Sequence, residues 1–212
     1  FKTPTQSLQS NVVGTQNILE WARKNGNIPV IYAGSSSKHG DIYSNPYSFT
    51  KWQGEQLCEM YSKVYDLPVT ICRFYNVYGP HQLTEGDYCT VLGIFESLYK
   101  NNKPLTITGD GEQRRDFTHV EDIVDGLIKC HNMNNQYTWP PANSFNQFEL
   151  GRGKNYSINE IADAFGDGYP RRYIDEWRGE MRDTLCTDTK AKDLLGWKPT
   201  RDIIEYIEET NG

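Results

Sequence analysis

The spacing of apolar residues changes several times along the chain, and each change predicts an element. Between residues 6 and 25 apolar side chains recur at helical intervals, which predicts a helix that ends near Gly26. Two nearly continuous apolar runs, residues 28–33 and 67–74, predict strands that are buried on both faces, and residues 47–65 between them predict a second helix. This order of helix, strand, helix and strand indicates an α/β protein with a parallel sheet covered by helices.

After Gly79-Pro80 the pattern becomes more mixed and predicts a smaller carboxy-terminal lobe. Ser157, followed by Glu160 three residues later, has the pattern of a capping box at a helix start. The other expected elements are helices at 88–100, 121–132 and 189–195, strands at 105–108 and 144–151, a strand-like segment at 184–187, a polar loop at 132–144 and a last helix from about 201.

Composition narrows the class of protein. The 212 residues are 37% hydrophobic and 24% charged, with a net charge of −6, which is typical of a soluble and mildly acidic protein. The basic residues are dispersed, so we expect no nucleic-acid partner. The five cysteines are scattered without C-x-x-C spacing, which favours reduced thiols, a cytoplasmic location and no metal site. No apolar run approaches the ~18 residues of a membrane span.

The candidate chemistry is concentrated between residues 30 and 51, which read VIYAGSSSKHGDIYSNPYSFTK. An apolar strand ends in a serine turn, and Asn45 and Pro46 then have the pattern of a helix start. Tyr47 and Lys51 follow at i, i+4, so the phenol and the ammonium share one helix face and the cation can favour the phenolate. Ser35 at the strand end can hold a substrate oxygen whose proton the phenolate takes.

The Tyr-x-x-x-Lys pattern has little value without this context. The chain has 14 tyrosines, and Tyr99 and Lys103 repeat the spacing where no serine turn precedes them. We interpret that second match as a helix end with an exposed lysine. A partly buried tyrosine beside a solvated lysine is the ordinary alternative at Tyr47, and the strand, turn and capped helix make it the weaker one.

Segments along the whole chain resemble the NAD-dependent epimerase/dehydratase family, the extended short-chain dehydrogenase/reductases that act on nucleotide sugars. The matching stretches are NVVGTQNILEWA, VIYAGSSS, YSFTK, RFYNVYGP, PLTITGDGEQRRDFTHVEDIV, ELGRGKNYSINEIA and RGEMRDTLCTDTKAKDLLGWKP, in the family's order. The resemblance implies a partial Rossmann-type parallel sheet in residues 1–80. It further implies that residues 81–212 form mainly a substrate lobe, with returns to that sheet.

The resemblance also implies the role of individual residues. Catalytic roles fall on Ser35, Tyr47, which is the general base, and Lys51. The residues expected to bind NAD are Tyr47, Lys51, Phe74, Tyr75 and Val77, and those expected to bind the nucleotide sugar are Asn11, Ser36, Asn76, Arg115 and Arg178. The two arginines are expected near the diphosphate, where a bidentate guanidinium suits phosphate oxygens. The ordinary alternatives are that Asn76 is a turn residue and that Arg115 belongs to a surface ion pair.

The chain departs from the family's pattern in its glycines. No Gly-x-x-Gly-x-x-Gly turn occurs, and only Gly14 and Gly26 precede the serine turn. That turn supplies the backbone N–H groups that hold the cofactor's pyrophosphate. We therefore expect the chain to be a piece of a longer protein, and we expect the 212 residues alone to bind NAD poorly and to show no epimerase activity.

Two further departures bear on the reaction. The stretch from Asp41 to Pro46 is short, which predicts an open sugar pocket. Ser36 and Ser37 stand where sugar 4,6-dehydratases place acids and where fucose-pathway reductase-epimerases place a cysteine. The main hypothesis is therefore an NAD-dependent epimerase of a nucleotide-activated sugar that passes through a keto intermediate. A dehydratase or reductase of the same family, and a non-catalytic homologue, remain alternatives, and His39 is a weak candidate for an additional acid or base.

The expected partners are a nucleotide sugar and a second copy of the chain. Relatives in the family dimerise through a four-helix bundle, which corresponds here to the helices at 6–25 and 47–65. These two helices are expected to lie side by side, with Trp52, Leu57 and Met60 among the subunit contacts.

Overall fold

A computed structural model describes residues 4–86, 89–135, 145–176 and 180–211, and the side chains of residues 134–135 are not considered. The chain forms two compact units, each built from three stretches of sequence. Unit 1 comprises Phe1–Phe74, Asp125–Leu150 and Asp188–Trp197, and unit 2 comprises Tyr75–Val124, Gly151–Thr187 and Lys198–Gly212.

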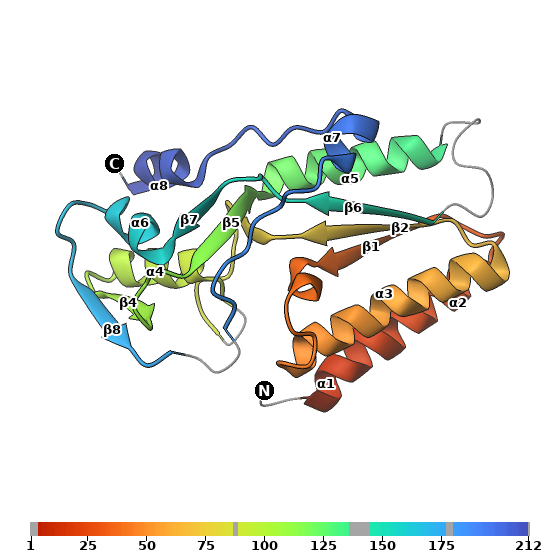
Figure 1. Ribbon diagram of the computed structural model, residues 1–212, viewed down its shortest axis with the longest axis horizontal. Helices are drawn as coiled ribbons and strands as arrows, with labels where there is room; N and C mark the ends of the chain where they lie inside the picture. The colour runs from red at the N-terminus through yellow and green to blue at the C-terminus, as the bar shows by residue number, and fades with distance from the viewer. Residues whose placement is uncertain (1–3, 87–88, 136–144, 177–179, 212) are drawn as a thin grey trace. The chain divides into compact units, whose positions relative to one another are not determined.

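Unit 1 is a three-stranded sheet with helices on both faces (Figure 1). Its strands are β1 (Val30–Ser35), β2 (Val69–Phe74) and β6 (Phe145–Leu150). Its helices are α1 (Pro4–Leu8), the π-helix η1 (Gln9–Val13), α2 (Gly14–Lys24), the 3-10 helix η2 (Ser36–His39), α3 (Pro46–Tyr65), most of α5 (Val120–Asn135) and α7 (Lys190–Leu195). The strand order is β1-β2-β6 and both pairings are parallel, so the predicted parallel sheet is confirmed.

The predicted pair of amino-terminal helices is also confirmed. α1, η1 and α2 follow one another as the segment expected at 6–25, and this segment packs along α3 (Figure 1). The helical pair buries its apolar side against β1 and β2 through a core that includes Leu19, Cys58, Leu67 and Ile71. The sequence pattern did not indicate the π-helical turn Gln9–Val13 inside the first segment.

Local sequence explains where α3 begins. Asn45 has extended backbone angles, and its side-chain oxygen accepts a hydrogen bond from the Ser48 N–H at 2.9 Å. Pro46 occupies the first helical turn, where its missing N–H costs nothing. Asp66 ends the helix in the left-handed conformation. The expected helix start therefore agrees with the structure, and it fixes the position of every side chain on α3.

Unit 2 contains shorter strands and more irregular backbone. Its strands are β3 (Asn76–Tyr78), β4 (Leu105–Thr108), β5 (Arg114–His119), β7 (Asn155–Ser157) and β8 (Arg171–Ile174). Its helices are α4 (Val91–Lys100), the first turn of α5, α6 (Ile158–Asp163) and α8 (Ile203–Asn211). β5 pairs with β3 in parallel and with β7 in antiparallel orientation, and β4 pairs with β8 in parallel. Aromatic and aliphatic side chains from these elements form one core, which includes Tyr78, Phe95 and Phe117.

Two expectations for unit 2 have clear outcomes. The capping box at α6 is present, because Ser157 and Glu160 exchange hydrogen bonds of 3.0 and 2.6 Å between side chain and backbone. The strand-like segment at 184–187 is wrong. The N–H groups of Thr184 and Cys186 bond to the Arg114 carbonyl and to the Asp116 carboxylate, respectively, so the segment forms no ladder of its own.

Candidate active site

The serine turn follows directly from the end of β1 in unit 1. Ser35 is the last residue of the strand, and its buried Oγ accepts a hydrogen bond from the Ser37 N–H at 3.2 Å. Ser36 then opens the short helix η2. Within the described ranges the buried Ser37 Oγ has no hydrogen-bond partner, so the turn holds an unused hydroxyl. The structure thus places the predicted Ser35 and Ser36 where a parallel sheet exposes its carboxyl ends.

Tyr47 and Lys51 lie one helical turn apart at the start of α3. The Tyr47 side chain is about half exposed, at 51%, so its phenol is open to a ligand. Lys51 Nζ donates a hydrogen bond to the Ala33 carbonyl and lies 4.5 Å from the centre of the Tyr32 ring. α3 packs against β1 and η2. The lysine therefore lies against the strand that ends in Ser35.

The surroundings of Lys51 act on its charge in two opposing ways. Burial lowers the pKa of the ammonium, because a partly desolvated cation is less stable than one in water. The Glu55 carboxylate, one turn further along α3, raises the pKa against this effect. The charge on Lys51 thus depends on a neighbour that the sequence analysis did not single out.

Asn11 lies in the π-helical turn η1 and contacts α3 directly. Its Nδ2 donates a hydrogen bond to Thr50 Oγ1 at 3.1 Å, immediately before Lys51. π-helical turns often occur at functional sites, because they displace one residue from the regular helix surface. Asn11, which the resemblance assigns to the nucleotide sugar, thus supports α3 through Thr50, and its contact with a ligand stays a prediction.

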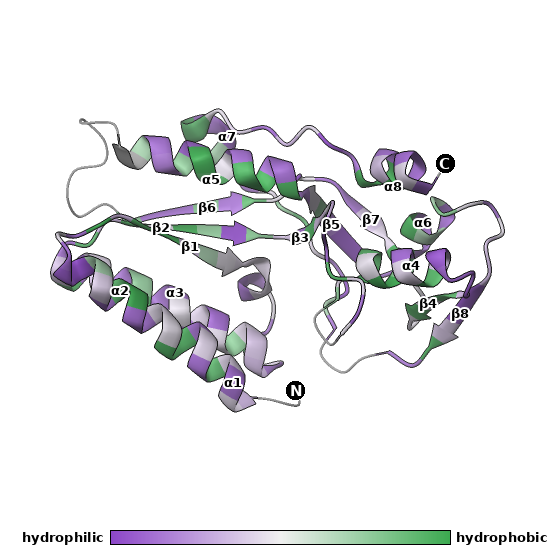
Figure 2. Ribbon diagram, turned by 180° about the vertical axis from the view of Figure 1, so that it is seen from behind, coloured by the Kyte–Doolittle hydropathy of each residue, from purple (hydrophilic) through white to green (hydrophobic). Residues whose placement is uncertain are grey.

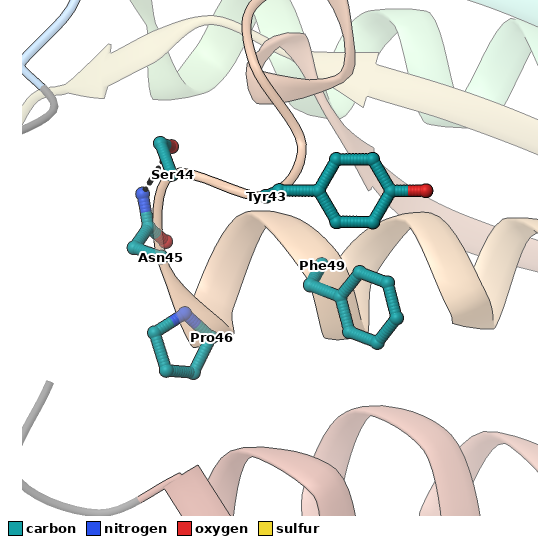
Figure 3. Close-up of a pocket in the computed structure, with 5 residues that line it drawn as sticks. All are labelled: Tyr43, Ser44, Asn45, Pro46 and Phe49. Atoms are coloured by element: carbon teal, nitrogen blue, oxygen red, sulfur yellow. Dashed lines mark hydrogen bonds between the residues drawn. The ribbon is translucent and has the colours of Figure 1, made fainter.

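A shallow hollow of about 310 Å³ lies beside the short loop that precedes α3 (Figure 3). Its lining residues are Tyr43, Ser44, Asn45, Pro46 and Phe49. The ring centres of Tyr43 and Phe49 are 5.7 Å apart, and Phe49 contacts Trp52 at 5.8 Å. Tyr47 is not among the lining residues, so the hollow adjoins the catalytic candidates without containing the proposed base.

The three other residues expected at the cofactor follow β2. Phe74 is the last residue of that strand in unit 1, and Tyr75 and Val77 come next in the chain at the start of unit 2. Within unit 2, Tyr75 packs so closely on Gly151 that a Cβ there would come within 2.7 Å of the Tyr75 ring.

Unit 2 contains a pocket of about 260 Å³ that includes two of the predicted substrate-binding residues, Asn76 and Arg115. The pocket is lined by Asn76, Cys89, Thr90, Val91, Ile94, Thr106, Thr108, Gln113, Arg115, Phe117, Ile158, Ile174 and Glu180. Most of its exposed lining surface is apolar, although seven of the thirteen lining residues have polar side chains. Mixed walls of this kind are typical of small-molecule sites.

Side chains from distant parts of unit 2 orient the polar groups of this pocket. Arg115 Nη2 lies 2.9 Å from Glu180 Oε1, and burial lowers the pKa of the guanidinium. Asn76 Nδ2 donates to the Asp116 carbonyl at 3.2 Å and to Thr184 Oγ1 at 3.4 Å. The structure therefore brings Asn76 and Arg115 to one pocket. Arg178, the third predicted residue, lies outside the described residues.

Two acidic residues in and beside this pocket, Glu180 and Asp116, have roles that no sequence pattern indicated. Asp116 is fully buried and accepts backbone hydrogen bonds from Arg152, Gly153 and Cys186 at 2.9 to 3.0 Å. Glu180 forms an ion pair with the guanidinium of Arg115. An acidic residue directly after Arg115 and an Arg-Gly-Glu triplet were visible in the sequence, but no spacing rule connects residues 65 positions apart.

Comparisons with known proteins agree with this architecture. A model of the NAD dependent epimerase/dehydratase family matches residues 1–139. The chain is 29% identical to a putative UDP-glucose 4-epimerase of Methanocaldococcus jannaschii, over 98% of the chain and 70% of that protein. It is 31% identical to a UDP-glucuronate 4-epimerase of Thermodesulfobacterium geofontis, over 99% of the chain and 66% of that protein.

A solved structure extends the likeness to three dimensions. The UDP-glucuronic acid 4-epimerase of Bacillus cereus, crystallised with UDP-glucuronic acid and NAD, superposes with a TM-score of 0.83 at 27% identity, over 95% of the chain and 66% of that protein. The chain therefore belongs to the NAD-dependent epimerase/dehydratase family, and the predicted family and fold class are confirmed. It spans about two-thirds of the length of these relatives. Among the described helices, none is both long and apolar enough to cross a membrane.

Proposed function

We propose that the protein is an NAD-dependent epimerase that inverts a hydroxyl-bearing carbon of a nucleotide-activated sugar. The observation that carries this proposal is the arrangement of Tyr47 and Lys51 on one turn of α3, with Lys51 bonded to the strand that ends in Ser35. An exposed phenol beside an ammonium and a serine hydroxyl are the groups that move a proton on and off an alcohol. The relatives named above, which are UDP-sugar 4-epimerases, support the same reaction.

Each catalytic residue has a separate task. Tyr47, as a phenolate, takes the proton of the sugar hydroxyl. As a phenol, it later returns a proton to the same oxygen, after the configuration of the carbon has been inverted. Lys51 favours the phenolate through its positive charge. Ser35 holds the sugar oxygen by a hydrogen bond, and Ser36 lies beside it for a second polar contact. Asn11 supports α3 through Thr50.

The residues present fit the nicotinamide side of an NAD site. The Tyr47 side chain is half exposed, and the Lys51 ammonium, which contacts the Ala33 carbonyl and the Tyr32 ring, has three N–H donors and so can also bond to a ribose hydroxyl. Phe74, the last residue of β2, and the residues Tyr75 and Val77 that come next in the chain remain predicted cofactor-binding residues. When bound, NAD supplies the hydride acceptor that makes the proton transfer from the hydroxyl productive.

We assign the pocket of unit 2 to the nucleotide and diphosphate of the substrate. Arg115 offers a fork of donors that matches phosphate oxygens, and Asn76 adds an amide at the same pocket. Arg178 would add a second guanidinium. In this assignment unit 1 contributes Tyr47 and Lys51 to NAD binding, and unit 2 contributes Asn76 and Arg115 to binding of the nucleotide and diphosphate. The division into residues 1–80 and 81–212 stays a prediction.

We further propose that two copies associate through α1, α2 and α3. Hydrophobic stretches occur along α2 and α3 (Figure 2), and Ile18, Trp21, Met60 and Val64 are exposed on them. Met60 was expected in this contact, whereas the expected Leu57 also packs on the core of unit 1 and Trp52 on Phe49. Two helices from each copy would then bury these apolar side chains together.

All five cysteines are free, which supports the reducing cytoplasm as the location.

The second candidate is a dehydratase or reductase of the same family. Ser36 and Ser37 provide no carboxylate or thiol beside Ser35, and His39 Nε2 is engaged with Glu149 at 3.1 Å. Elimination of water from carbon 6 needs an acid that these positions lack, which favours the epimerase.

The test is the product formed by the natural protein from UDP-glucose or UDP-glucuronic acid in the presence of NAD. An epimerase returns a nucleotide sugar of unchanged mass with one inverted carbon, which proton NMR detects. Loss of water, or net reduction, would instead support the second candidate. Absence of any product from both substrates, although each binds, would support a non-catalytic homologue.

A further inference from the structure

Behind the Tyr47–Lys51 turn, unit 1 holds a buried group of charges for which the proposed reaction has no use. Arg73 of β2 lies between Glu55 of α3 and Glu149 of β6, and all three residues are less than a tenth exposed. Arg73 Nε and Nη2 approach the Glu55 oxygens at 3.0 and 2.8 Å, and Nη1 lies 2.7 Å from Glu149 Oε1. The guanidinium of Arg73 on β2 therefore contacts α3 through two bonds to Glu55 and contacts β6 through one bond to Glu149.

This group touches the backbone that delivers Ser35. In the sheet register Gly34 is paired with Arg73, and Arg73 with Glu149, so the three residues form one row across the strands. A Cβ at position 34 would come within 2.8 Å of both the Arg73 Cγ and the Glu55 Oε1. The Arg73–Glu55 pair thus packs directly on the residue before Ser35, and only glycine leaves room for it.

Lys51 and Glu55 together hold α3 on the last residues of β1. They are one helical turn apart and therefore on the same helix face. Lys51 bonds to the carbonyl of Ala33, while Glu55 lies against Gly34. Gly54 permits this close approach, because a Cβ there would lie 2.1 Å from the Tyr32 hydroxyl.

We propose that Glu55, clamped by Arg73, is a positioning residue for the catalytic lysine: it fixes α3 on the end of β1, and its negative charge keeps Lys51 an ammonium. The proposal rests on the proposed function, because it assigns Lys51 to catalysis. Stability alone is a poor reason for these three buried charges, since apolar residues of similar volume often serve a core as well or better.

The other ionisable groups around Lys51 leave this task to Glu55. Burial raises the pKa of the Tyr32 phenol beyond its usual range and that of the Cys58 thiol to about 12, so both are uncharged at neutral pH. Lys38 Nζ lies 3.9 Å from Glu55 and adds positive charge from η2. Tyr47 faces Lys51 from its own helix, Arg73 is positive, and Glu149 and His39 lie beyond Arg73. Among these groups the carboxylate that raises the pKa of Lys51 is Glu55.

The deciding variant is Glu55→Gln in the natural protein, because it keeps the shape and removes the charge. Turnover should fall about ten- to a hundredfold at an unchanged KM for the nucleotide sugar, since a small displacement of a reacting group can cost on the order of 10²-fold. Labelling of Lys51 by acetic anhydride across a pH range, read by mass spectrometry, should show a lowered pKa of the ammonium. A merely loosened helix would rehydrate Lys51 and raise that pKa.

The matched control is Glu59→Gln, one turn further along α3, where the carboxylate pairs with Lys63 at the surface. It should leave turnover and Lys51 labelling as in the wild type. Arg73→Lys keeps the charge without the fork, so turnover should fall while Lys51 still titrates as in the wild type. This variant also carries the test if Glu55→Gln fails to fold in a thermal melt.

Three outcomes would overturn the proposal: wild-type turnover in Glu55→Gln, a raised or unchanged Lys51 pKa in that variant, or full activity of Arg73→Lys. An inactive wild-type protein would instead contradict the proposed function. In that case the labelling experiment still reports whether Glu55 sets the charge of Lys51.

Discussion

Arg115 and Glu180 form an ion pair inside the pocket of unit 2, with Nη2 and Oε1 2.9 Å apart and both side chains mostly buried. The pair keeps the guanidinium at the pocket wall and balances a charge that burial disfavours. A diphosphate offers the same fork two acceptor oxygens and more negative charge than one carboxylate. Under the proposed assignment, the diphosphate of the substrate would replace Glu180 on the Arg115 guanidinium.

Arg115→Gln should weaken binding of the nucleotide sugar without changing the chemical step. A hydrogen bond to a charged group contributes about 1.5–3 kcal/mol, so we expect Kd to rise roughly ten- to a hundredfold. Calorimetric titration with UDP-glucose measures this directly.

Arg114→Gln is the matched control for this variant. Arg114 bonds to the Asn155 side chain and to Glu160, and it does not line the pocket. Its removal should leave the Kd for the nucleotide sugar unchanged. Equal effects of the two substitutions would contradict the assignment of the pocket.

Acid should reveal the stabilising contribution of Glu149. Burial alone would raise the pKa of this carboxyl, but hydrogen bonds from His39 and Arg73 outweigh it and hold the pKa below its usual range. A lowered folded-state pKa gives stability that is present above the unfolded pKa of about 4.3 and is lost as pH falls through the folded value. The free energy of unfolding should therefore fall more steeply below about pH 4 in the wild type than in Glu149→Gln.

Urea unfolding at several pH values between neutrality and strong acid measures this difference. The exposed Glu208 of α8 provides a control, because Glu208→Gln should leave the acid slope of the wild type in place. Parallel curves for the wild type and Glu149→Gln would show that the buried pair does not contribute.

The proposed dimer predicts that a charge on the exposed face of α2 separates the subunits. Ile18→Glu places a carboxylate on a side chain that is 59% exposed in the single chain. Sedimentation velocity should then report a monomer. Leu194→Glu on α7, at a similarly exposed apolar side chain, should leave the dimer intact. A wild-type protein that is monomeric at micromolar concentration would contradict this contact.

Much of unit 1 could be predicted from sequence because its signals are local. Asn45, Pro46 and the alternation of helical and strand patterns fix α3 and the sheet within a few residues. The strands β3, β5, β7 and β8 escaped: three of them have only three or four residues, and the charged residues of β5 hide its periodicity.

The residues of the candidate site likewise differ in how far the sequence indicates them. Ser35, Tyr47 and Lys51 could be proposed from the sequence because a strand end and one helix turn hold them close together in the chain. Glu55, Arg73 and Glu149 were not, because their contact depends on the register of three strands. Likewise, the fold of unit 2 brings Glu180 to Arg115, and no periodic pattern in the sequence indicates this ion pair.

The 212 residues themselves should bind NAD weakly, because they contain no Gly-x-x-Gly-x-x-Gly turn to hold the pyrophosphate. We expect an affinity at least about a hundredfold below that of an intact relative, equivalent to about 2.7 kcal/mol. Calorimetric titration of the 212-residue chain with NAD measures it. Micromolar binding would show that the cofactor is held by other residues.

The central claim is that Tyr47 is the base of a nucleotide-sugar epimerase. Tyr47→Phe in the natural protein removes only the ionisable oxygen of a half-exposed side chain, so binding of the nucleotide sugar should persist. General acid–base catalysis is typically worth about 10²–10⁴ in rate, and turnover should fall by this factor, while Ser35→Ala should cost less. The most direct measurement is proton NMR of UDP-glucose or UDP-glucuronic acid incubated with each protein and NAD. The account predicts an inverted sugar with the wild type and almost none with Tyr47→Phe; residual activity above about a tenth of wild type would contradict it.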